Sequence, residues 1–333
     1  MHLDDKIYVA GHRGLAGSAL VRRLVAAGYS NLITRTHAEI DLEEQPAVRQ
    51  FFERERPAHV FLAAAKVGGI HANNSYPADF ISVNLAIQHN VIDAAMRIGV
   101  QRLLFLGSSC IYPRDCPQPM KESYLLTGPL EPTNRPYAIA KIAGIELCWA
   151  LNRQHGTRFI AAMPTNLYGP GDNYDLENSH VLPALIRKAH EAKVRGDRQL
   201  VVWGTGAPRR EFLYSDDMAD ACITLMQLPD AGFDTLLNPP AEDAQPPLIN
   251  IGCGSDLTVR ELAETIARVV GFKGELVFDT SKPDGAPRKL LDVSRIEGLG
   301  WRPKVALQNG VALAYQSYLD SIASDARQAG SKH

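Results

Sequence analysis

The first half of the chain alternates continuous apolar runs with longer segments of helical spacing. The apolar runs lack polar alternation, which is typical of parallel strands buried on both faces of a sheet. These runs lie at 7–11, 59–65, 102–109 and 159–166. Segments 18–28 and 84–99 have helical spacing, and each ends at a glycine. This strand–helix alternation predicts an α/β fold with a doubly wound parallel sheet.

The second half of the chain has a less regular pattern. Helices are expected at about 180–194, at 213–228 and at 258–270, with a strand at 199–204. Thr258 and Glu261 have the spacing of a capping box that opens the third of these helices. The segment 237–247 is polar and rich in proline, so we expect a surface loop there. The pattern predicts a smaller α/β domain beside the sheet.

We therefore expect two interleaved domains. Residues 1–165, with a return segment at about 214–252, are predicted to form a cofactor-binding domain. Residues 166–213 and about 253–325 are predicted to form a substrate domain.

Composition excludes several classes of function. The chain has 333 residues and a net charge of −2, so we expect neither a nucleic-acid partner nor attraction to a membrane surface. We expect no signal peptide and no membrane span, because no apolar run is long enough. The five cysteines are odd in number and lack CxxC spacing, which favours neither a disulfide framework nor a metal site. A protein of the reducing cytoplasm fits this cysteine content.

A glycine-rich turn, GHRGLAG, links the first strand to the first helix. Gly11, Gly14 and Gly17 would let backbone N–H groups approach a pyrophosphate at the helix N-terminus. Because the strand and the helix flank the motif, the interpretation as a dinucleotide site is favoured over a plain tight turn.

The residues after the second expected strand favour NADP over NAD. A ribose 2′-hydroxyl would need a carboxylate there, whereas a 2′-phosphate needs arginine. The chain offers Arg35 and then His37, with no acid before Glu39. Arg13, inside the glycine turn, can reach the same place, although Arg35 could also be only a solvated surface charge.

Three residues suggest the chemistry of a reductase. Tyr137 and Lys141 are four residues apart on one helical face, so an ammonium group would lower the pKa of the phenol. Ser108 ends the strand at 102–109 and could hydrogen-bond the same substrate oxygen. Together with the glycine turn, this set predicts a proton donor beside a bound nicotinamide.

From residue 6 to about 320, the chain resembles the extended short-chain dehydrogenases/reductases that act on nucleotide sugars. The resemblance rests on GHRGLAGSAL, AAAKVGGI, GSSCIYP, YAIAK, MPTNLYGPGDNY, VVWGTGAPRREFLY and KPDGAPRKLLDVSR. More closely, it is similar to bifunctional members that invert carbons 3 and 5 of GDP-4-keto-6-deoxy-D-mannose and then reduce the 4-keto group with NADPH. This chain has His37 where that group often has a second arginine.

The resemblance gives roles to a cysteine and a histidine. Cys110 stands where related dehydratases have a basic glutamate, so it is the expected base for epimerisation, with a thiolate favoured by a cation such as Lys141. His180 is the expected opposing acid, near a helix N-terminus that would lower its pKa. Read without the resemblance, Cys110 would be a small apolar residue at a strand end.

The resemblance also implies binding residues. The cofactor set is Gly11, His12, Arg13, Gly14, Leu15, Ala16, Gly17, Arg35, His37, Asp41, Leu42, Ala63, Ala64, Ala65, Leu106, Gly107, Lys141, Pro164, Asn166, Leu167 and His180. The GDP-sugar set is Lys188, Trp203, Arg210, Asp284 and Lys289. Similar proteins pair through the helix that carries Tyr137, so a homodimer is expected.

Two alternatives stay open. An NAD-dependent nucleotide-sugar 4-epimerase or 4,6-dehydratase would share the fold, although Arg35 and Cys110 argue against it. A non-catalytic NADP(H)-binding regulator would not need the set of Ser108, Tyr137 and Lys141.

Overall fold

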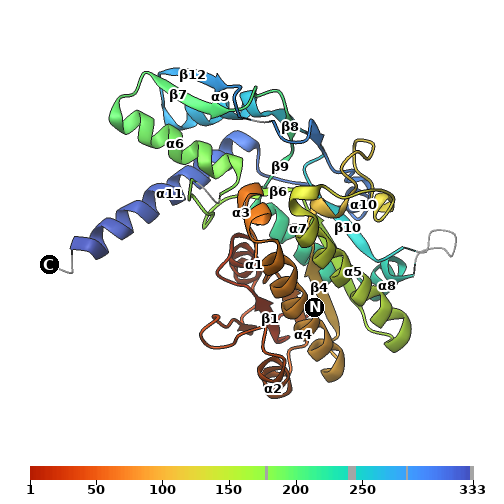
Figure 1. The fold of residues 1–333 in the computed structure, drawn as a ribbon. Helices are drawn as coiled ribbons and strands as arrows, with labels where there is room; N and C mark the ends of the chain where they lie inside the picture. Colours follow the sequence, from red (N-terminus) through yellow and green to blue (C-terminus); the bar gives the residue numbers. More distant parts are fainter. Residues whose placement is uncertain (177–178, 239–244, 283, 331–333) are drawn as a thin grey trace.

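A computed structural model describes residues 1–176, 179–238, 245–282 and 284–330. Two packed regions make up the molecule: a large unit around a six-stranded sheet, and a small unit above it in Figure 1. Most of the expected loop at 237–247 lies outside the described residues.

The large sheet is entirely parallel, and its strands follow the order β2-β1-β3-β4-β5-β10. The strands are β1 (Ile7–Ala10), β2 (Leu32–Ile33), β3 (His59–Leu62), β4 (Arg102–Leu106), β5 (Phe159–Pro164) and β10 (Leu248–Ile251). The chain runs from β1 outward to β2 and then returns to the other side of β1 as β3. This reversal makes a topological switch point, where the carboxyl ends of strands form a binding crevice.

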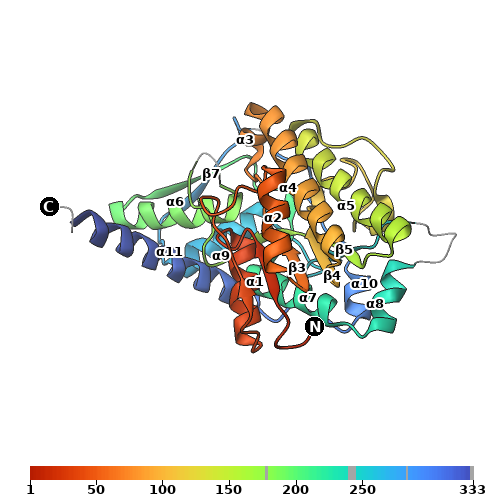
Figure 2. The same ribbon diagram turned by 90° about the horizontal axis from the view of Figure 1, so that it is seen from below.

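Helices cover both faces of the large sheet, as Figure 2 shows from below. One face carries α2 (Gln45–Glu55), α4 (Pro77–Ile98) and α5 (Arg135–His155), and the other carries α1 (Leu15–Ala26), α7 (Ser215–Gln227) and α8 (Asp230–Leu237). Successive residues of one strand point to opposite faces. Tyr8 and Ala10 therefore pack in one core, and Ile7 and Val9 in the other. The predicted doubly wound parallel sheet is confirmed.

The small unit has a separate apolar core. Its helices are α6 (Val181–Arg195), α9 (Val259–Val270) and α11 (Leu307–Gly330), and α11 projects away from the body in Figure 1. Its strand pairs are β7 (Gln199–Trp203) with β12 (Glu275–Asp279), β6 (Asn166–Tyr168) with β9 (Phe212–Tyr214), and β8 (Arg209–Arg210) between β11 (Leu257–Thr258) and β13 (Arg288–Lys289). The predicted capping box of Thr258 and Glu261 is confirmed at the start of α9.

Short elements complete the described chain. They are α3 (Ile70–Ser75), α10 (Ser294–Gly298) and three 3₁₀ turns, η1 (Ser109–Ile111), η2 (Glu122–Tyr124) and η3 (Pro132–Asn134). In the described residues, no helix is both long and apolar enough to cross a membrane.

Two strands end three residues earlier than the sequence suggested. The strand expected at 59–65 ends at Leu62, and the one expected at 102–109 ends at Leu106. In the second case the Ser108 hydroxyl accepts a hydrogen bond from the Cys110 backbone N–H and caps η1. A hydroxyl that bonds its own local backbone competes with the strand ladder. Ser108 and Cys110 therefore lie in a turn beyond the carboxyl end of β4.

The chain passes repeatedly between the two units. After strand β9 of the small unit, it forms α7, α8 and β10 of the large unit and then returns to β11 and α9. Later, Ile296 and Trp301 pack in the core of the large unit, before α11 joins the small one. The exact residue ranges of two functional domains stay a prediction.

Candidate active site

The three glycines of the first turn occupy different surroundings. Gly11 has φ +85°, and a Cβ there would lie 2.6 Å from the Ala64 backbone nitrogen. A Cβ on Gly17 would lie 2.1 Å from the Gly11 carbonyl oxygen. At Gly14 the nearest such atom is 3.5 Å away, an ordinary contact. Gly11 and Gly17 therefore permit close backbone packing, whereas a side chain at Gly14 would meet no clash. Gly14 is the N-cap residue of α1, and a helix N-terminus of this kind suits a pyrophosphate.

The rest of the turn also suits a polar ligand. The Nδ1 atom of His12 is buried and has no hydrogen-bond partner among the described residues. Burial is the main cause that lowers the pKa of His12, and the charge of Arg13 adds to it. Leu15 and Ala16 begin α1 directly behind this turn. An unpartnered buried ring nitrogen in this turn fits a cofactor group that brings its own donor or acceptor.

The expected phosphate-binding residues gather near Glu39. Hydrogen bonds from Thr36 are the main cause that lowers the pKa of Glu39, and the charges of Arg35 and Arg13 add to it. Arg35 is also tied by an ion pair to Glu55 at 3.0 Å. The guanidinium groups of Arg13 and Arg35 therefore both act on the region around Glu39.

The other expected cofactor residues in this part of the chain have different surroundings. His37 is exposed, with Nδ1 3.8 Å from Asp41 Oδ1. Leu42 packs against the core of the large unit instead. Asp41 accepts a hydrogen bond from the Glu43 backbone N–H at 2.9 Å.

The remaining cofactor candidates line the carboxyl edge of the sheet. Ala63, Ala64 and Ala65 follow β3 directly and are half-buried. The others are Leu106 and Gly107 at the end of β4, Pro164 at the end of β5, and Asn166 and Leu167 in β6. All of them follow or end strands at the same edge as the glycine turn, because the sheet is parallel.

Ser108, Cys110 and Tyr137 form one cluster at this edge. The Ser108 Oγ and Cys110 Sγ atoms are 2.8 Å apart. Ser108 also hydrogen-bonds the Tyr137 phenol, and the charge of a Cys110 thiolate would act on the same phenol. Phe80 packs edge-on against the Tyr137 ring, with centroids 6.2 Å apart. The sequence placed these residues together correctly in space, although their roles stay a prediction.

Lys141 is buried, with 3% of its surface exposed. Its Nζ donates a hydrogen bond to the Leu106 carbonyl at 2.8 Å and lies 5.8 Å from the centroid of the Tyr137 ring. Burial lowers the pKa of Lys141 to about 8. The ammonium therefore lies beside the phenol but bonds to the end of β4.

The expected lowering of the Tyr137 pKa by Lys141 was wrong. Burial is the main cause that raises the pKa of the phenol, the charge of Cys110 raises it further, and only the hydrogen bond from Ser108 lowers it. The free-energy cost of desolvating a phenolate is larger than the stabilisation that the Ser108 hydrogen bond provides. Tyr137 is therefore held as a protonated donor.

Cys110 is 9% exposed, and burial raises the pKa of its thiol. Three influences lower it: the charge of Lys289, which is the largest, hydrogen bonds from Ser108 and the backbone, and the charge of Lys141. Lys141 does lower the pKa of the thiol, as expected, but Lys289 has the larger effect. The sequence analysis assigned Lys289 to the GDP-sugar set and did not connect it with Cys110, because β13 lies far along the chain.

His180 is the N-cap residue of α6, and its side chain makes no capping hydrogen bond. Its pKa is lowered, as the sequence indicated, and desolvation is the cause. Since α6 belongs to the small unit, His180 and Cys110 come from different units.

The five expected GDP-sugar residues form a connected set in the small unit. Arg210 and Lys289 are paired in register on β8 and β13. Burial lowers the pKa of Arg210, and the charge of Asp284 opposes this. Lys188 lies over the Trp203 ring, with Nζ 4.4 Å from the centroid.

Asp284 is hydrogen-bonded to Thr205, which lies two residues after Trp203 in the chain. It accepts hydrogen bonds from the Thr205 backbone N–H at 2.9 Å and from its hydroxyl at 2.6 Å. The five residues therefore share one part of the small unit.

Glu211 is a residue that the sequence reasoning missed. It is fully buried, and its carboxylate accepts hydrogen bonds from the backbone N–H groups of Cys253, Gly254 and Leu291. The signal was an acid inside the apolar strand segment EFLY. A buried carboxylate needs several donors, and here these donors hold the chain next to Lys289.

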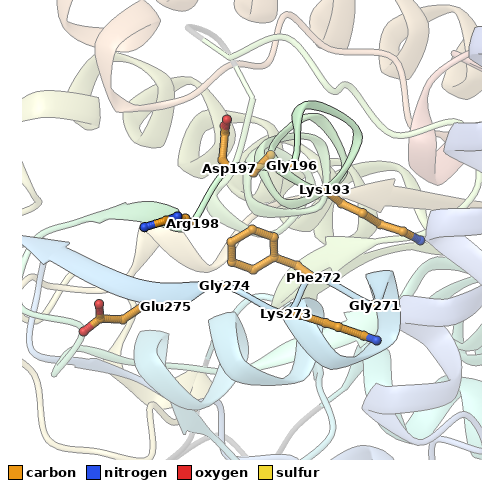
Figure 3. Close-up of a pocket in the computed structure, with 10 residues that line it drawn as sticks. Lys193, Gly196, Asp197, Arg198, Gly271, Phe272, Lys273, Gly274 and Glu275 are labelled. Atoms are coloured by element: carbon orange, nitrogen blue, oxygen red, sulfur yellow. The ribbon is translucent and has the colours of Figure 1, made fainter.

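A surface pocket lies elsewhere in the small unit, between the end of α6 and the start of β12 (Figure 3). Lys193, Arg198, Phe272 and Lys273 are among its lining residues. It shares no residue with the candidate site.

Comparison with known proteins agrees with this geometry. Residues 7–239 match the family model of the NAD dependent epimerase/dehydratase family. The chain is 58% identical to GDP-L-fucose synthase 1 of Arabidopsis thaliana, over 95% of this chain and 94% of that protein. It is 55% identical to the GDP-L-fucose synthase of Escherichia coli, over 95% and 97%.

Solved structures give the same picture. A GDP-mannoheptose C4 reductase from Campylobacter jejuni, solved with NADP bound, is 42% identical with a TM-score of 0.83. The match covers 96% of this chain and 99% of that one. With a parallel sheet, a glycine turn and a Ser–Tyr–Lys set at its carboxyl edge, the chain belongs to the NAD dependent epimerase/dehydratase family and, within it, to the GDP-L-fucose synthases.

Proposed function

We propose that the protein converts GDP-4-keto-6-deoxy-D-mannose to GDP-L-fucose, by epimerisation at carbons 3 and 5 and then reduction at carbon 4. The observation that carries this proposal is the cluster at the end of β4, where Ser108 Oγ lies 2.8 Å from Cys110 Sγ and hydrogen-bonds Tyr137. One cluster thus holds a titratable group for proton abstraction and a phenol for proton donation. The 55–58% identity to fucose synthases supports the choice of substrate.

In the epimerisation, Cys110 acts as the base. The 4-keto group acidifies the protons on carbons 3 and 5, because the resulting carbanion is an enolate. The thiolate removes such a proton and becomes a thiol, and His180 returns a proton to the opposite face. The lowered pKa of His180 makes its protonated form a stronger acid.

In the reduction, Tyr137 acts as the acid. The cofactor, NADPH, held at the glycine turn and by Arg13 and Arg35, supplies hydride to carbon 4 when it is bound. The Tyr137 phenol gives a proton to the alkoxide that forms, and its raised pKa keeps it protonated until then. Ser108 orients the substrate oxygen, and Lys141 lies beside the phenol.

The direct test is incubation of the protein with GDP-4-keto-6-deoxy-D-mannose and NADPH, with the product identified by NMR. We expect GDP-L-fucose and one NADPH consumed for each molecule formed. GDP-4-keto-heptoses serve as competing substrates, since the NADP-bound relative is a GDP-mannoheptose reductase. Turnover of the heptoses alone would reject the fucose assignment, and absence of turnover with every nucleotide sugar would favour a regulator.

Two variants separate the half-reactions. In heavy water, Tyr137→Phe is expected to exchange protons at carbons 3 and 5 but to lose about 100-fold or more in reduction. Cys110→Ser is expected to lose the exchange. Exchange at the wild-type rate in Cys110→Ser would show that the thiol is not the base.

We also propose that the protein is a homodimer of the cytoplasm. Helices α4 and α5 lie side by side on one face and carry the exposed apolar side chains Leu85 and Ile139. Five free thiols, among them the catalytic candidate Cys110, suit a reducing compartment. Light scattering of the purified protein measures the mass, and a monomer at micromolar concentration would contradict the dimer.

A further inference from the structure

Asn250 is a polar residue that is fully buried in β10, at one edge of the large sheet. Its Oδ1 atom accepts a hydrogen bond from the Tyr112 hydroxyl at 2.5 Å. Its Nδ2 atom donates to two backbone carbonyls, that of Met120 at 2.9 Å and that of Asp292 at 3.1 Å. Its backbone N–H donates to Glu122 Oε1 at 3.0 Å. These bonds make a specific connection, because an unpaired polar group would be costly at such a buried position.

The bonds of Asn250 join three segments that are far apart in the sequence: the chain after η1, the chain around η2 and the chain after β13. The second and third segments also bond to each other. The Asp292 N–H donates to the Met120 carbonyl at 2.8 Å, and the Met120 N–H donates to the Leu290 carbonyl at 2.7 Å. Asn250 therefore connects the turn of the catalytic cluster and the strand that carries Lys289 to the same point of β10.

The turn that carries Ser108 and Cys110 ends at Tyr112. Its own N–H groups make hydrogen bonds longer than the ordinary N–H···O distance of about 2.9 to 3.0 Å. The Cys110 nitrogen lies 3.4 Å from Ser108 Oγ, and the nitrogens of Ile111 and Tyr112 lie 3.2 and 3.5 Å from the carbonyl oxygens three residues earlier. By contrast, the bond from Tyr112 to Asn250 is short, and the Tyr112 ring packs in a core of the large unit. The end of the turn is therefore anchored by the tyrosine side chain.

We propose that Tyr112 and Asn250 hold the catalytic turn in place, and so act as positioning residues for both half-reactions. This inference rests on the proposed function. The Tyr112 hydroxyl is bonded to Asn250, so it acts on the reaction only through the backbone that it anchors. Ser108 and Cys110 precede it by four and two residues. A weaker anchor would slow proton abstraction and reduction together, because a displacement of about 1 Å in a reacting group can cost about 100-fold in rate.

The first test needs no substrate. Tyr112→Phe keeps the buried ring and removes only the hydroxyl. Hydrogen–deuterium exchange of residues 108–112 is followed by mass spectrometry in the ligand-free protein, with the β4 amides of residues 102–106 as an internal reference. We expect the turn to exchange about tenfold faster in Tyr112→Phe, while β4 keeps its wild-type rate. An unchanged turn, or an equal acceleration of turn and strand, would overturn the proposal.

Tyr29→Phe is the matched control. Tyr29 is similarly buried on the opposite face of the sheet, and its hydroxyl accepts a hydrogen bond from Gln227 at 2.8 Å. Its removal is expected to leave the turn at the wild-type exchange rate. Asn250→Ala removes the acceptor instead of the donor, and it decides the question if Tyr112→Phe does not fold. Since both substitutions break the same bond, their effects on the turn should not add in the double variant, and additive effects would contradict the proposal.

The second test connects the turn to the reaction. Proton exchange at carbons 3 and 5 in heavy water and NADPH oxidation in a single turnover are measured for Tyr112→Phe and Tyr29→Phe. For Tyr112→Phe we expect both rates to fall about tenfold with KM for the GDP-sugar unchanged, and for Tyr29→Phe no change. A rise in KM with unchanged rates would show that the network only supports substrate binding, which contradicts the proposal. If the wild type itself exchanges no protons, the proposed function fails, but the deuterium exchange of the turn still decides whether Tyr112 anchors it.

Discussion

The cofactor end and the substrate end of this molecule are built in different ways. At the glycine turn, backbone packs on backbone, with Gly11 against Ala64 and Gly17 against Gly11. At the substrate end, long side chains from separate elements converge, among them Lys188 on α6, Trp203 on β7 and Lys289 on β13. At the glycine turn, an added side-chain atom at Gly11 or Gly17 would collide with backbone. The substrate end instead depends on long side chains that come from different elements.

This difference matches the chemistry of the two ligands. A pyrophosphate can be held by backbone N–H groups at a helix N-terminus, which any sequence with the right glycines supplies. A particular sugar nucleotide must be recognised by side chains. We therefore expect substitutions at the closely packed Gly11 and Gly17 to act through stability, and those at the substrate end to act through affinity or rate.

The largest expected effect tests the rigidity of the glycine turn. Gly17→Ala should destabilise the protein by about 3 kcal/mol or more, because the new methyl would collide with the Gly11 carbonyl. Gly14→Ala is the control: it should fold within about 1 kcal/mol of the wild type but bind NADPH more weakly. Urea unfolding and NADPH fluorescence titration measure the two effects. Equal stability of the two variants would break the comparison.

An intermediate effect concerns Lys141, which lies between the two regions. Its pKa in the folded chain is about 8, below the ordinary 10.5, so the folded state binds fewer protons than the unfolded state between these values. The free energy of unfolding should therefore rise with pH over this range, by up to about 1.4 kcal/mol per pH unit relative to Lys141→Met. Urea unfolding from pH 7 to 10.5 checks this. Parallel curves for the two proteins would show that the lysine is not desolvated.

The smallest expected effect sharpens the description of the substrate end. Trp203 is 59% exposed and supports Lys188. Trp203→Ala should raise KM for the GDP-sugar roughly fivefold, about 1 kcal/mol, with little change in stability. Trp149→Ala removes a comparable ring, stacked under Arg153 at 4.0 Å on α5, and should leave KM unchanged. Steady-state kinetics with varied substrate distinguish the two.

Features that depend on residues close in sequence could be predicted. The glycine turn, the one-turn spacing of Tyr137 and Lys141, and the capping box of Thr258 and Glu261 are all local, and the structure contains each of them. Continuous apolar strands likewise predicted a sheet covered on both faces. In each case the physical cause acts over a few residues.

Features that depend on burial and on distant segments could not be predicted. The neighbours of Tyr137 were predicted correctly, but the direction of its pKa shift was not, because desolvation of the buried phenol is the largest cause. The influence of Lys289 on Cys110 needs β13 to fold back beside Met120 and Gln118. No pattern within either segment signals that approach.

The repeated crossing of the chain between the two units limits how such an enzyme can diversify. Between segments of the small unit, the chain returns to the large unit twice. It does so first as α7, α8 and β10, and later at Ile296 and Trp301. No single recombination point would transplant the substrate-binding region as a cassette. New substrates in this architecture would have to arise by replacement of individual side chains on a retained backbone.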